Sequence, residues 1–434
     1  MIGAGSTIAA QLARRRASAA SAWNLADELV LIGAGEPIPV PGRYDRTYPF
    51  RAHSEYLYLT DRERPGGVLA FDPADGWTDF VAPVTREELL WSGADDLEEG
   101  VPDGARSVTE LPAWLEERKG RRRGCLGAAI AGVSSDNAFD GELRYLLTGV
   151  RRAKDEVELA RMRTAEQATR FGFLAVAELI GEGRAERELQ IELEAQFFRS
   201  GADALAFDTI VAGGPHAAVL HFAPTARPLG RGELVLIDAG GEYRGYASDI
   251  TRTYPVAGGF SSEQEHLYGV VRQALGAAIE TCRPGVEWHD VHRRAALVIA
   301  DGLVELGILK GDAESLFECG AVTLFFPHGV GHMVGLGVRD AGGVLRGRDK
   351  PGPGFPRLRV DLPLQVGYAL TVEPGIYFIP PMLRDRTTRE RLRDQVDWDR
   401  VDDLLDFGGI RLEDNILVTH DGCDVLTGDV PFIG

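Results

Sequence analysis

The chain has 434 residues, 44% of them hydrophobic, and a mean hydropathy of −0.11, values of a soluble folded protein too long for a single hydrophobic core. Its formal net charge of −19 at pH 7 argues against nucleic acids and anionic membranes as partners. No apolar run approaches the length of a membrane span, so we expect no transmembrane segment.

The N-terminal segment "MIGAGSTIAAQLARRR" is a poor signal peptide, because its three arginines follow the short apolar stretch instead of preceding it. The cysteines have no C-x-x-C spacing and are expected to be thiols in a reducing compartment. We therefore expect a cytoplasmic protein. The four cysteines are Cys125, Cys282, Cys319 and Cys423.

The first 150 residues have the pattern of a small α/β domain. A helix is expected from about Ala9 to Glu28, followed by strands in "ELVLIGAG", "GGVLAFDP" and "TDFVAPV" and a helix in "LPAWLEERKG". We interpret "VSSDNAFDGELRYLLTGVRRAKDE" as a junction and place a boundary near Val150. One domain is thus predicted over residues 1–150 and a larger one over residues 151–434.

The second domain is expected to be α+β. It opens with helical patterns in "DEVELARMRTAEQATRFGFLAVAELI" and "AERELQIELEAQFFRSG", and from Thr209 the pattern changes to strands and turns. Two more helices are expected around Ser262–Cys282 and Glu287–Leu306. The Pro/Gly-rich stretch "RDKPGPGFPRLR" is expected to be a loop.

Two aspartates are the first candidate site residues. Asp238 ends the apolar strand "ELVLID", and Asp249 lies 11 residues further on, beyond Gly240 and Gly241. A strand–turn–strand arrangement would place both on neighbouring strands, where cross-strand side chains stand about 5 Å apart. One carboxylate could then bridge two ions while the other binds one of them. Two solvated aspartates beside a glycine turn are the alternative.

A histidine in a glycine-rich stretch is the second candidate. His332 and His328 in "FFPHGVGHMVGLGV" are spaced by four, which on a helix would suggest a zinc-binding pair. Gly329, Gly331 and Gly335 argue against a helix there. We therefore predict one ligand, His332, with His328 as a hydrogen-bonding neighbour. A histidine satisfied within the core is the alternative.

Two glutamates complete the set. Glu373 follows the apolar strand in "LTVEPGIY", and Glu413 lies in "GGIRLEDN", where Asp414 is expected to face solvent. An ionised acid in an apolar strand needs a partner, and a shared metal centre would supply one. Four carboxylates and one imidazole suit two closely spaced divalent ions such as manganese better than a single structural zinc.

The order Asp, Asp, His, Glu, Glu in these contexts resembles the pita-bread metallopeptidases, which include methionine aminopeptidase, aminopeptidase P and prolidase. The resemblance extends from about Arg151 to the C-terminus, and "YPFRAHSEYLYLTD" resembles the creatinase-type N-terminal domain of aminopeptidase P and prolidase. It implies a pita-bread catalytic domain preceded by a smaller α/β domain. It also implies two divalent ions, with manganese preferred and cobalt or zinc as alternatives, and a homodimer.

The resemblance also implies a role for each residue. Asp238 would chelate one ion, Asp249 and Glu413 would bridge both, and His332 and Glu373 would complete the second. A shared water or hydroxide would be the nucleophile, with Glu373 as proton shuttle. The remaining positions would bind substrate or support the ligands: His221 and His328 in the substrate pocket, Thr251 beside the water and Arg411 on a bridging carboxylate.

Within the family, the long segment between Glu373 and Glu413 resembles prolidases, as does "PRLRVDLPLQVGYALTVEPG". On that match Arg359 would bind the free carboxylate of a dipeptide. Two positions depart from the family pattern. Arg339 in "VRD" stands where a histidine is usual, and we expect it either to bind the carbonyl or carboxylate of the substrate or to pair with the neighbouring Asp340. Phe207 stands where a tyrosine is frequent.

The leading hypothesis is hydrolysis of Xaa-Pro dipeptides, with a small Xaa-Pro peptide as the expected substrate. Xaa-Pro aminopeptidase activity on longer peptides is the nearest alternative. Organophosphate hydrolysis needs the same metal site and stays open as a side activity. A metal-free, creatinase-like enzyme and a non-enzymatic binding module are disfavoured by the intact ligand set.

Overall fold

The computed structural model describes residues 7–42, 46–92, 99–134, 136–348, 352–356, 358–428, 430 and 432. The chain divides into two compact units, Ile2–Arg151 and Arg152–Gly434. None of the helices in the described ranges combines the length and apolar character needed to cross a membrane. Part of the stretch "RDKPGPGFPRLR", where a loop is expected, lies outside the described residues. The first six residues, which belong to the segment compared with a signal peptide, also lie outside them.

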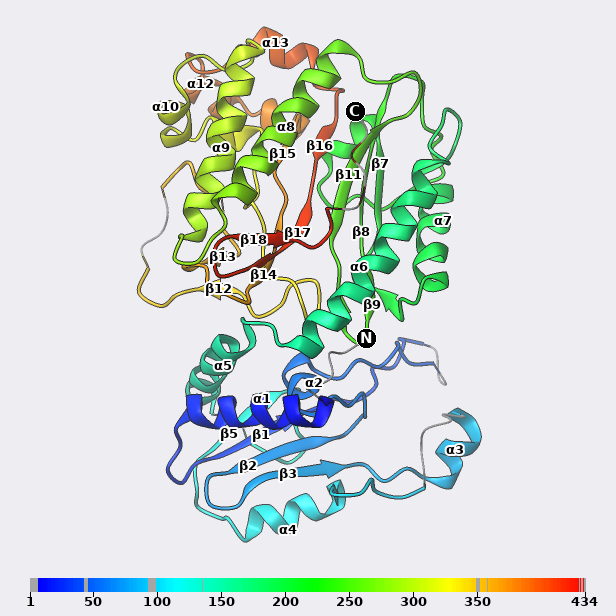
Figure 1. The fold of residues 1–434 in the computed structure, drawn as a ribbon, viewed down its shortest axis with the longest axis vertical. Helices are drawn as coiled ribbons and strands as arrows, with labels where there is room; N and C mark the ends of the chain where they lie inside the picture. The colour runs from blue at the N-terminus through cyan, green and yellow to red at the C-terminus, as the bar shows by residue number, and fades with distance from the viewer. Residues whose placement is uncertain are drawn as a thin grey trace. The chain divides into compact units, whose positions relative to one another are not determined.

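The N-terminal unit is built on one mixed sheet with strand order β4-β3-β2-β1-β5. Strand β1 pairs antiparallel with β2 and parallel with β5, and helix α1 packs against α2 and α5 (Figure 1). The elements of this unit are α1 (Ile8–Trp23), β1 (Leu29–Gly33), α2 (Ser54–Thr60), β2 (Val68–Asp72), β3 (Gly76–Val81), α3 (Arg86–Ser92), β4 (Arg106–Ser107), η1 (Val108–Glu110), α4 (Leu111–Glu116), β5 (Arg123–Gly127) and α5 (Asn137–Arg151).

Two expectations for this unit are wrong in detail. Helix α1 ends at Trp23 and not at Glu28, because Asn24 adopts a left-handed conformation (φ 47°) and its N–H bonds to the carbonyl of Ala20. The segment interpreted as a junction contains the helix α5. Its signal was an apolar face at four-residue intervals, formed by Phe139, Leu143 and Leu147, all of them buried.

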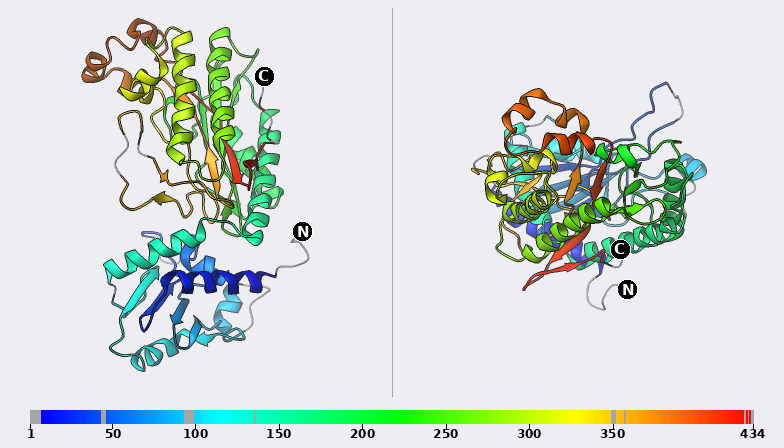
Figure 2. Two further views of the ribbon diagram at one scale, coloured as in Figure 1. Left: turned by 60° about the vertical axis from the view of Figure 1, so that its left-hand side comes forward. Right: turned by 90° about the horizontal axis from the view of Figure 1, so that it is seen from above.

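The C-terminal unit places long helices on the two sides of short, strongly buried strands. Helices α6 and α7 pack together on one side of the strands and α8 and α9 on the other (Figures 1 and 2). The elements are α6 (Glu156–Ala177), α7 (Glu186–Arg199), β6 (Ala204–Leu205), β7 (Ile210–Gly213), η2 (Gly214–Ala218), β8 (Leu234–Ala239), β9 (Gly241–Tyr243), β10 (Tyr246–Ala247), β11 (Ile250–Pro255), α8 (Ser262–Thr281), α9 (Trp288–Glu305), α10 (Ala313–Glu318), η3 (Val322–Leu324), β12 (Gly343–Val344), β13 (Val360–Asp361), β14 (Ala369–Val372), β15 (Gly375–Tyr377), α11 (Pro380–Leu383), α12 (Arg386–Arg391), α13 (Trp398–Asp403), β16 (Gly409–Arg411), β17 (Asp414–Val418) and β18 (Cys423–Val425).

The sheets of this unit meet where the candidate residues lie. One sheet has the order β11-β8-β7 and another β14-β17-β18, while β15 and β16 form a pair. A bridge between Thr251 and Glu413 joins the first sheet to the C-terminal strands, and a bridge between Met333 and Leu370 joins the histidine segment to β14. The topology therefore gathers segments that are far apart in the sequence at one place.

Candidate metal centre

One aspartate lies on strand β8 and the other directly before its antiparallel partner β11. Asp238 lies in β8, all six residues of which are buried, and its register partner on β11 is Thr251. Asp249 directly precedes β11, and Asn415 fixes its backbone by accepting from its N–H (3.1 Å) and donating to its carbonyl (2.8 Å). Strands β9 and β10 form the connection, so the expected arrangement is confirmed with a longer turn.

His332 lies in an extended segment beside β14, and no helix forms around it. Its N–H donates to the hydroxyl of Thr371 (3.1 Å), and its carbonyl accepts from the Thr371 N–H (2.8 Å). Its Nδ1 lies 3.1 Å from the carbonyl of Met333, which holds the proton on Nδ1. The lone pair of Nε2 then faces Asp249 at 3.4 Å and Glu373 at 3.8 Å.

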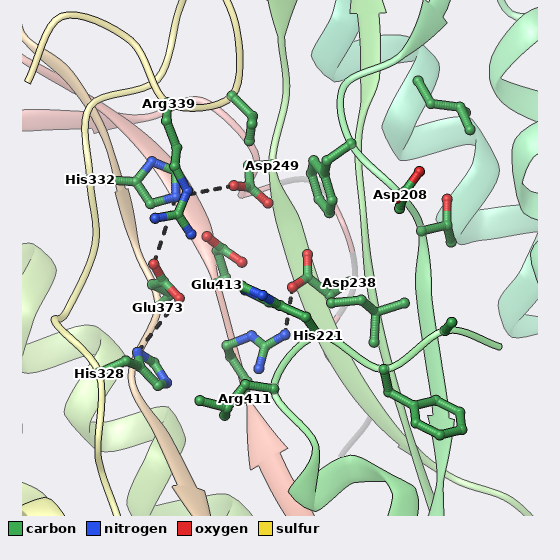
Figure 3. Close-up of a pocket in the computed structure, with 18 of the residues that line it drawn as sticks. Asp208, His221, Asp238, Asp249, His328, His332, Arg339, Glu373, Arg411 and Glu413 are labelled. Carbon is green, nitrogen blue, oxygen red and sulfur yellow. Dashed lines mark hydrogen bonds and ion pairs between the residues drawn. The ribbon is translucent and has the colours of Figure 1, made fainter. Parts of the chain in front are cut away.

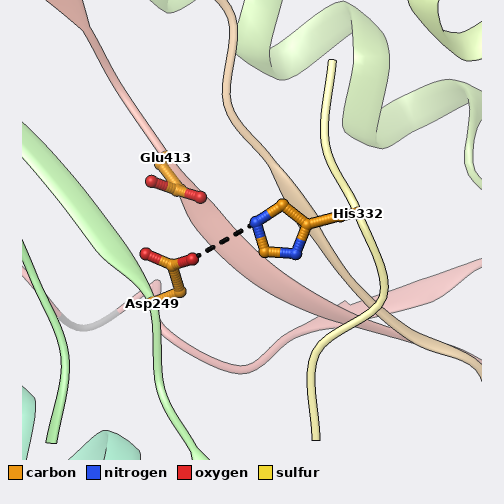
Figure 4. Close-up of side chains that lie close together, drawn as sticks. All are labelled: Asp249, His332 and Glu413. Atoms are coloured by element: carbon orange, nitrogen blue, oxygen red, sulfur yellow. Dashed lines mark ion pairs between the residues drawn. The ribbon is translucent and has the colours of Figure 1, made fainter. Parts of the chain in front are cut away.

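The glutamates approach from the C-terminal strands. Glu373 follows β14, and its N–H bonds to the carbonyl of Val330 (2.7 Å). Glu413 lies between β16 and β17 and accepts a hydrogen bond from the Thr251 hydroxyl (2.7 Å). One ligand atom from each of Asp249, His332 and Glu413 lies within 4.8 Å of the others (Figure 4). This is the spacing of groups that can share a cation.

Arg411 holds Asp238 beside the other three carboxylates. The guanidinium of Arg411, which is 4% exposed, donates to Asp238, to the Thr251 hydroxyl (3.1 Å) and to the Tyr377 hydroxyl (2.8 Å). Arg411 thus contacts Asp238 and not Asp249. Tyr377, which the sequence analysis missed, also bonds to Nε2 of His328 (2.9 Å). Its only signal was a tyrosine in the strand that follows Glu373.

Asp414 was expected to face solvent, and this is wrong. Asp414 is 2% exposed and forms an ion pair at 2.8 Å with Arg252, which is fully buried. It also accepts from the Thr427 hydroxyl (2.8 Å). The pair anchors β11 to β17, because Arg252 also donates to the carbonyl of Glu413 (2.6 Å). Asp414 therefore helps to position its neighbour, with its charge balanced inside the protein.

Burial and mutual repulsion act on the carboxylates together. Burial raises the pKa of Asp249 well above its ordinary value, and the charges of Asp238 and Glu373 add to the increase. The pKa of Glu413 is raised in the same way, by burial and then by Asp249 and Glu373. Burial also raises the pKa of Glu373. Oδ1 of Asp238 is buried and accepts no hydrogen bond from any residue that the structure describes.

This donor set fits divalent cations. Four carboxylates face one another, and the guanidinium groups of Arg411 and Arg339 oppose their charge. Placing such acids out of water is costly unless a cation compensates them. Carboxylate oxygens with one imidazole nitrogen are ligands that manganese, cobalt and zinc all accept.

The centre opens into a cavity of about 760 Å³ (Figure 3). The cavity is lined by all the sequence-predicted residues except Thr251, which lies behind Glu413. Phe207 lines it as well. The predicted residues in the lining are Asp238, Asp249, His332, Glu373, Glu413, His221, His328, Arg339, Arg359 and Arg411.

The structure shows what surrounds His328 and Arg339, two of the residues expected in the substrate pocket. Burial lowers the pKa of His328 to about 3, with Arg411 contributing, so its ring is neutral at pH 7. Arg339 extends to the carboxylates beside His332 (Figure 3). Asp340, one possible partner for Arg339, is instead bound by Lys154 at 2.7 Å in a pair that is almost fully buried.

A buried glutamate holds the loop that carries His221. Glu186 on α7 is fully buried and accepts from the N–H of Gly213 (3.0 Å) and from Nδ1 of His216 (2.6 Å). It also accepts from the N–H (3.1 Å) and hydroxyl (2.7 Å) of Thr225. One carboxylate therefore fixes both ends of the loop that places His221 in the cavity.

Replacing Glu186 by glutamine should loosen this loop without changing the metal content. An amide presents N–H groups to donors and loses the charge-assisted hydrogen bonds, each worth about 1.5–3 kcal/mol. We expect KM for a peptide substrate to rise about tenfold and the thermal midpoint to fall, with metal stoichiometry unchanged. Glu192→Gln, an exposed position on the same helix, is the matched control. Equal kinetics in the two variants would refute the positioning role.

Comparison with known proteins agrees with this geometry. Residues 160–420 match metallopeptidase family M24, and residues 12–112 match the N-terminal domain of aminopeptidase P. A protein of Aspergillus clavatus called a probable Xaa-Pro aminopeptidase is 36% identical over 406 residues, covering 88% of this chain and 86% of its own.

Solved structures extend the likeness to the whole fold. The Pseudomonas aeruginosa aminopeptidase PepP superposes with a TM-score of 0.80 at 30% identity, covering 100% of this chain and 97% of its own. A zinc-substituted Escherichia coli aminopeptidase P with bound product has a TM-score of 0.79 at 28% identity, covering 98% and 96%. The chain belongs to metallopeptidase family M24, in its aminopeptidase P and prolidase branch. The expected pita-bread domain preceded by a smaller α/β domain is confirmed.

Proposed function

We propose that this metallopeptidase is an Xaa-Pro aminopeptidase that removes the residue preceding proline at the N-terminus of peptides. The observation that carries the proposal is the cluster of Asp249, His332 and Glu413, with Glu373 beside His332, in the lining of a cavity large enough for a peptide. The relatives and solved structures described above bear aminopeptidase names. They favour this activity over dipeptide hydrolysis, which was the leading hypothesis from sequence.

We assign the metal ions to the five predicted ligands, with manganese preferred and cobalt or zinc as alternatives. Divalent ions would supply Lewis-acid activation of water and of the scissile carbonyl. The assignment rests on the shared cavity and on the raised pKa values of Asp249 and Glu413, which follow from burial and from neighbouring carboxylates.

The side chains around the centre have complementary tasks. Glu373, with its raised pKa, can accept a proton at its carboxylate and pass it to the leaving amine of proline. His328 is neutral, and both of its ring nitrogens are engaged, Nδ1 with the carbonyl of Gly329 (2.9 Å) and Nε2 with the hydroxyl of Tyr377 (2.9 Å), so its fixed ring can contact the substrate without adding charge. His221 contributes a second imidazole from the opposite loop.

Dipeptidase activity remains a second candidate because of one observation. Arg359 is exposed and lines the cavity, where its guanidinium could bind a free carboxylate next to proline. A dipeptidase requires that charge at the end of its substrate, whereas an aminopeptidase accepts an amide there.

A substrate panel separates the two activities. The metal-loaded enzyme should cleave Ala-Pro-Ala and Ala-Pro-amide with kcat/KM at least tenfold above that for Gly-Pro. Arg359→Ala should then change the ratio between Ala-Pro-amide and Ala-Pro by less than threefold. If dipeptides are preferred and Arg359→Ala abolishes that preference, a loss of about 2–5 kcal/mol, the protein is a dipeptidase. Arg346→Ala is a control in the same region of the chain.

A further inference from the structure

Two cysteines that are far apart in the sequence lie side by side, outside the cavity. Cys282 caps the C-terminus of α8, and Cys423 begins β18. The Cys282 thiol donates to the carbonyl of Ala278 (3.3 Å) and the Cys423 thiol to the carbonyl of Ile279 (3.4 Å). Their sulfurs therefore bond to consecutive carbonyls of the last turn of α8, which places the two thiols next to each other.

The two thiols differ in exposure and acidity. Cys282 is 1% exposed within the main core cluster, whereas Cys423 is partly exposed at the end of a surface turn. The neighbouring Cys282 thiol lowers the pKa of Cys423, and the Cys423 thiol together with burial raises the pKa of Cys282. An accessible thiol that ionises more easily, next to a buried second thiol, is the arrangement of an attacking and a resolving cysteine.

The other two cysteines lack this arrangement. Burial raises the pKa of Cys125 to about 11, and its thiol donates to the carbonyl of Ser134 (3.7 Å). Cys319 donates to the carbonyl of Leu316 (3.5 Å). They serve as internal controls.

We propose that Cys282 and Cys423 are a modification site that hydroperoxides oxidise to a reversible disulfide joining β18 to the end of α8. The Cys423 thiolate attacks a peroxide oxygen, the O–O bond breaks, and hydroxide leaves to become water, forming a sulfenic acid. The sulfur of Cys282 then attacks that of Cys423 and loses its proton, and the S–OH bond breaks to release a second water. In total two thiols are oxidised and one hydrogen peroxide is reduced to two waters.

The disulfide would act on stability more than on catalysis. Cys423 pairs with Val418 at one end of β17, whereas Glu413 precedes the other end at Asp414. The cross-link would thus hold the β17–β18 hairpin to α8 at the end remote from the ligand. A long loop closed by a disulfide restricts the unfolded chain, so oxidation should stabilise the fold.

The test uses the full-length, metal-loaded protein treated with hydrogen peroxide, then alkylated under denaturing conditions and mapped by mass spectrometry. We expect free thiols to fall from four to two, with one disulfide between the peptides containing Cys282 and Cys423. The thermal midpoint should rise by roughly 5 °C and return after dithiothreitol, while peptidase activity changes less than twofold.

Variants identify the pair. Cys423→Ser should abolish both the disulfide and the rise in midpoint, whereas a Cys125→Ser, Cys319→Ser double variant should retain both. The peptide map needs no variant, so it decides the question even if Cys282→Ser does not fold. Four free thiols after oxidation, a disulfide between other cysteines, or conversion of Cys423 to sulfinic acid with Cys282 still reduced would each overturn the proposal.

Discussion

Asp249→Asn should abolish peptidase activity and reduce the bound metal. Asp249 lies 3.4 Å from His332 and belongs to the cluster whose ligand atoms all lie within 4.8 Å. An amide has half the ligand capacity of a carboxylate and no charge. Loss of an ion should cost about 4 kcal/mol of transition-state stabilisation, or about a thousandfold in kcat/KM. Metal analysis and kinetics on the purified variant measure the effect, with Glu413→Gln expected to behave alike.

Once metal is removed, the same substitution should make the folded protein more stable. In the unfolded chain Asp249 is ionised at pH 7, whereas its pKa in the folded protein is raised by burial and by Asp238 and Glu373. A carboxyl with a raised folded pKa favours folding below its unfolded pKa, and that contribution is lost as pH increases toward the folded value. The chelator-treated variant should therefore melt at a higher temperature than the chelator-treated parent at pH 7.

With metal present the parent should melt at a higher temperature than the variant, because metal binding stabilises the parent more. Asp301→Asn, an exposed aspartate on α9, provides the control and should change neither activity nor metal content. Full metal content with normal turnover in Asp249→Asn would show that the ligand assignment is wrong.

The sequence predicts the candidate centre better than its surroundings. Asp238, Asp249, His332 and Glu373 each stand at the end of a strand or within a glycine-rich stretch, and these are local signals. The contacts that orient them come from distant segments. Thr251 bonds to Glu413, and Asn415 to Asp249, through pairings that no local pattern specifies.

The errors have the same origin. Asp414 follows Glu413 in a polar tripeptide, so alternation alone suggests exposure, yet Arg252 from β11 pairs with it inside the protein. The place of Tyr377 in the strand after Glu373 did not reveal its role, because that role depends on Arg411 and His328, both brought to it by folding. The helix α5 was overlooked because the polar residues of the segment obscured its buried face.

Arg339 is the position at which this protein departs from the histidine that the resemblance to the family leads us to expect. Hydrogen bonds to Asp340 hold the loop that carries Arg339. Asp340 accepts them from Lys154 (2.7 Å) and from the N–H groups of Leu336 (3.0 Å) and Ala341 (2.7 Å). With Asp340 occupied in this way, the guanidinium of Arg339 extends into the cavity toward Glu373 (Figure 3). Arginine is permanently charged and only donates hydrogen bonds. It can therefore hold a carbonyl or carboxylate of the substrate at any working pH.

Arg339→Ala should lower kcat/KM by about 30-fold or more with metal content preserved, because a charged contact in a desolvated site contributes about 2–5 kcal/mol. Arg339→His should recover part of this activity and introduce a limb in the pH profile near the ordinary histidine pKa, about 6.5, which the parent lacks. Steady-state kinetics from pH 5.5 to 9 on parent and variants measure both effects, with Arg346→His controlling for a new histidine elsewhere. Higher activity in Arg339→His than in the parent would mean that arginine adapts the enzyme to a different substrate. Unchanged kcat/KM in Arg339→Ala would show that the side chain makes no contact with the peptide.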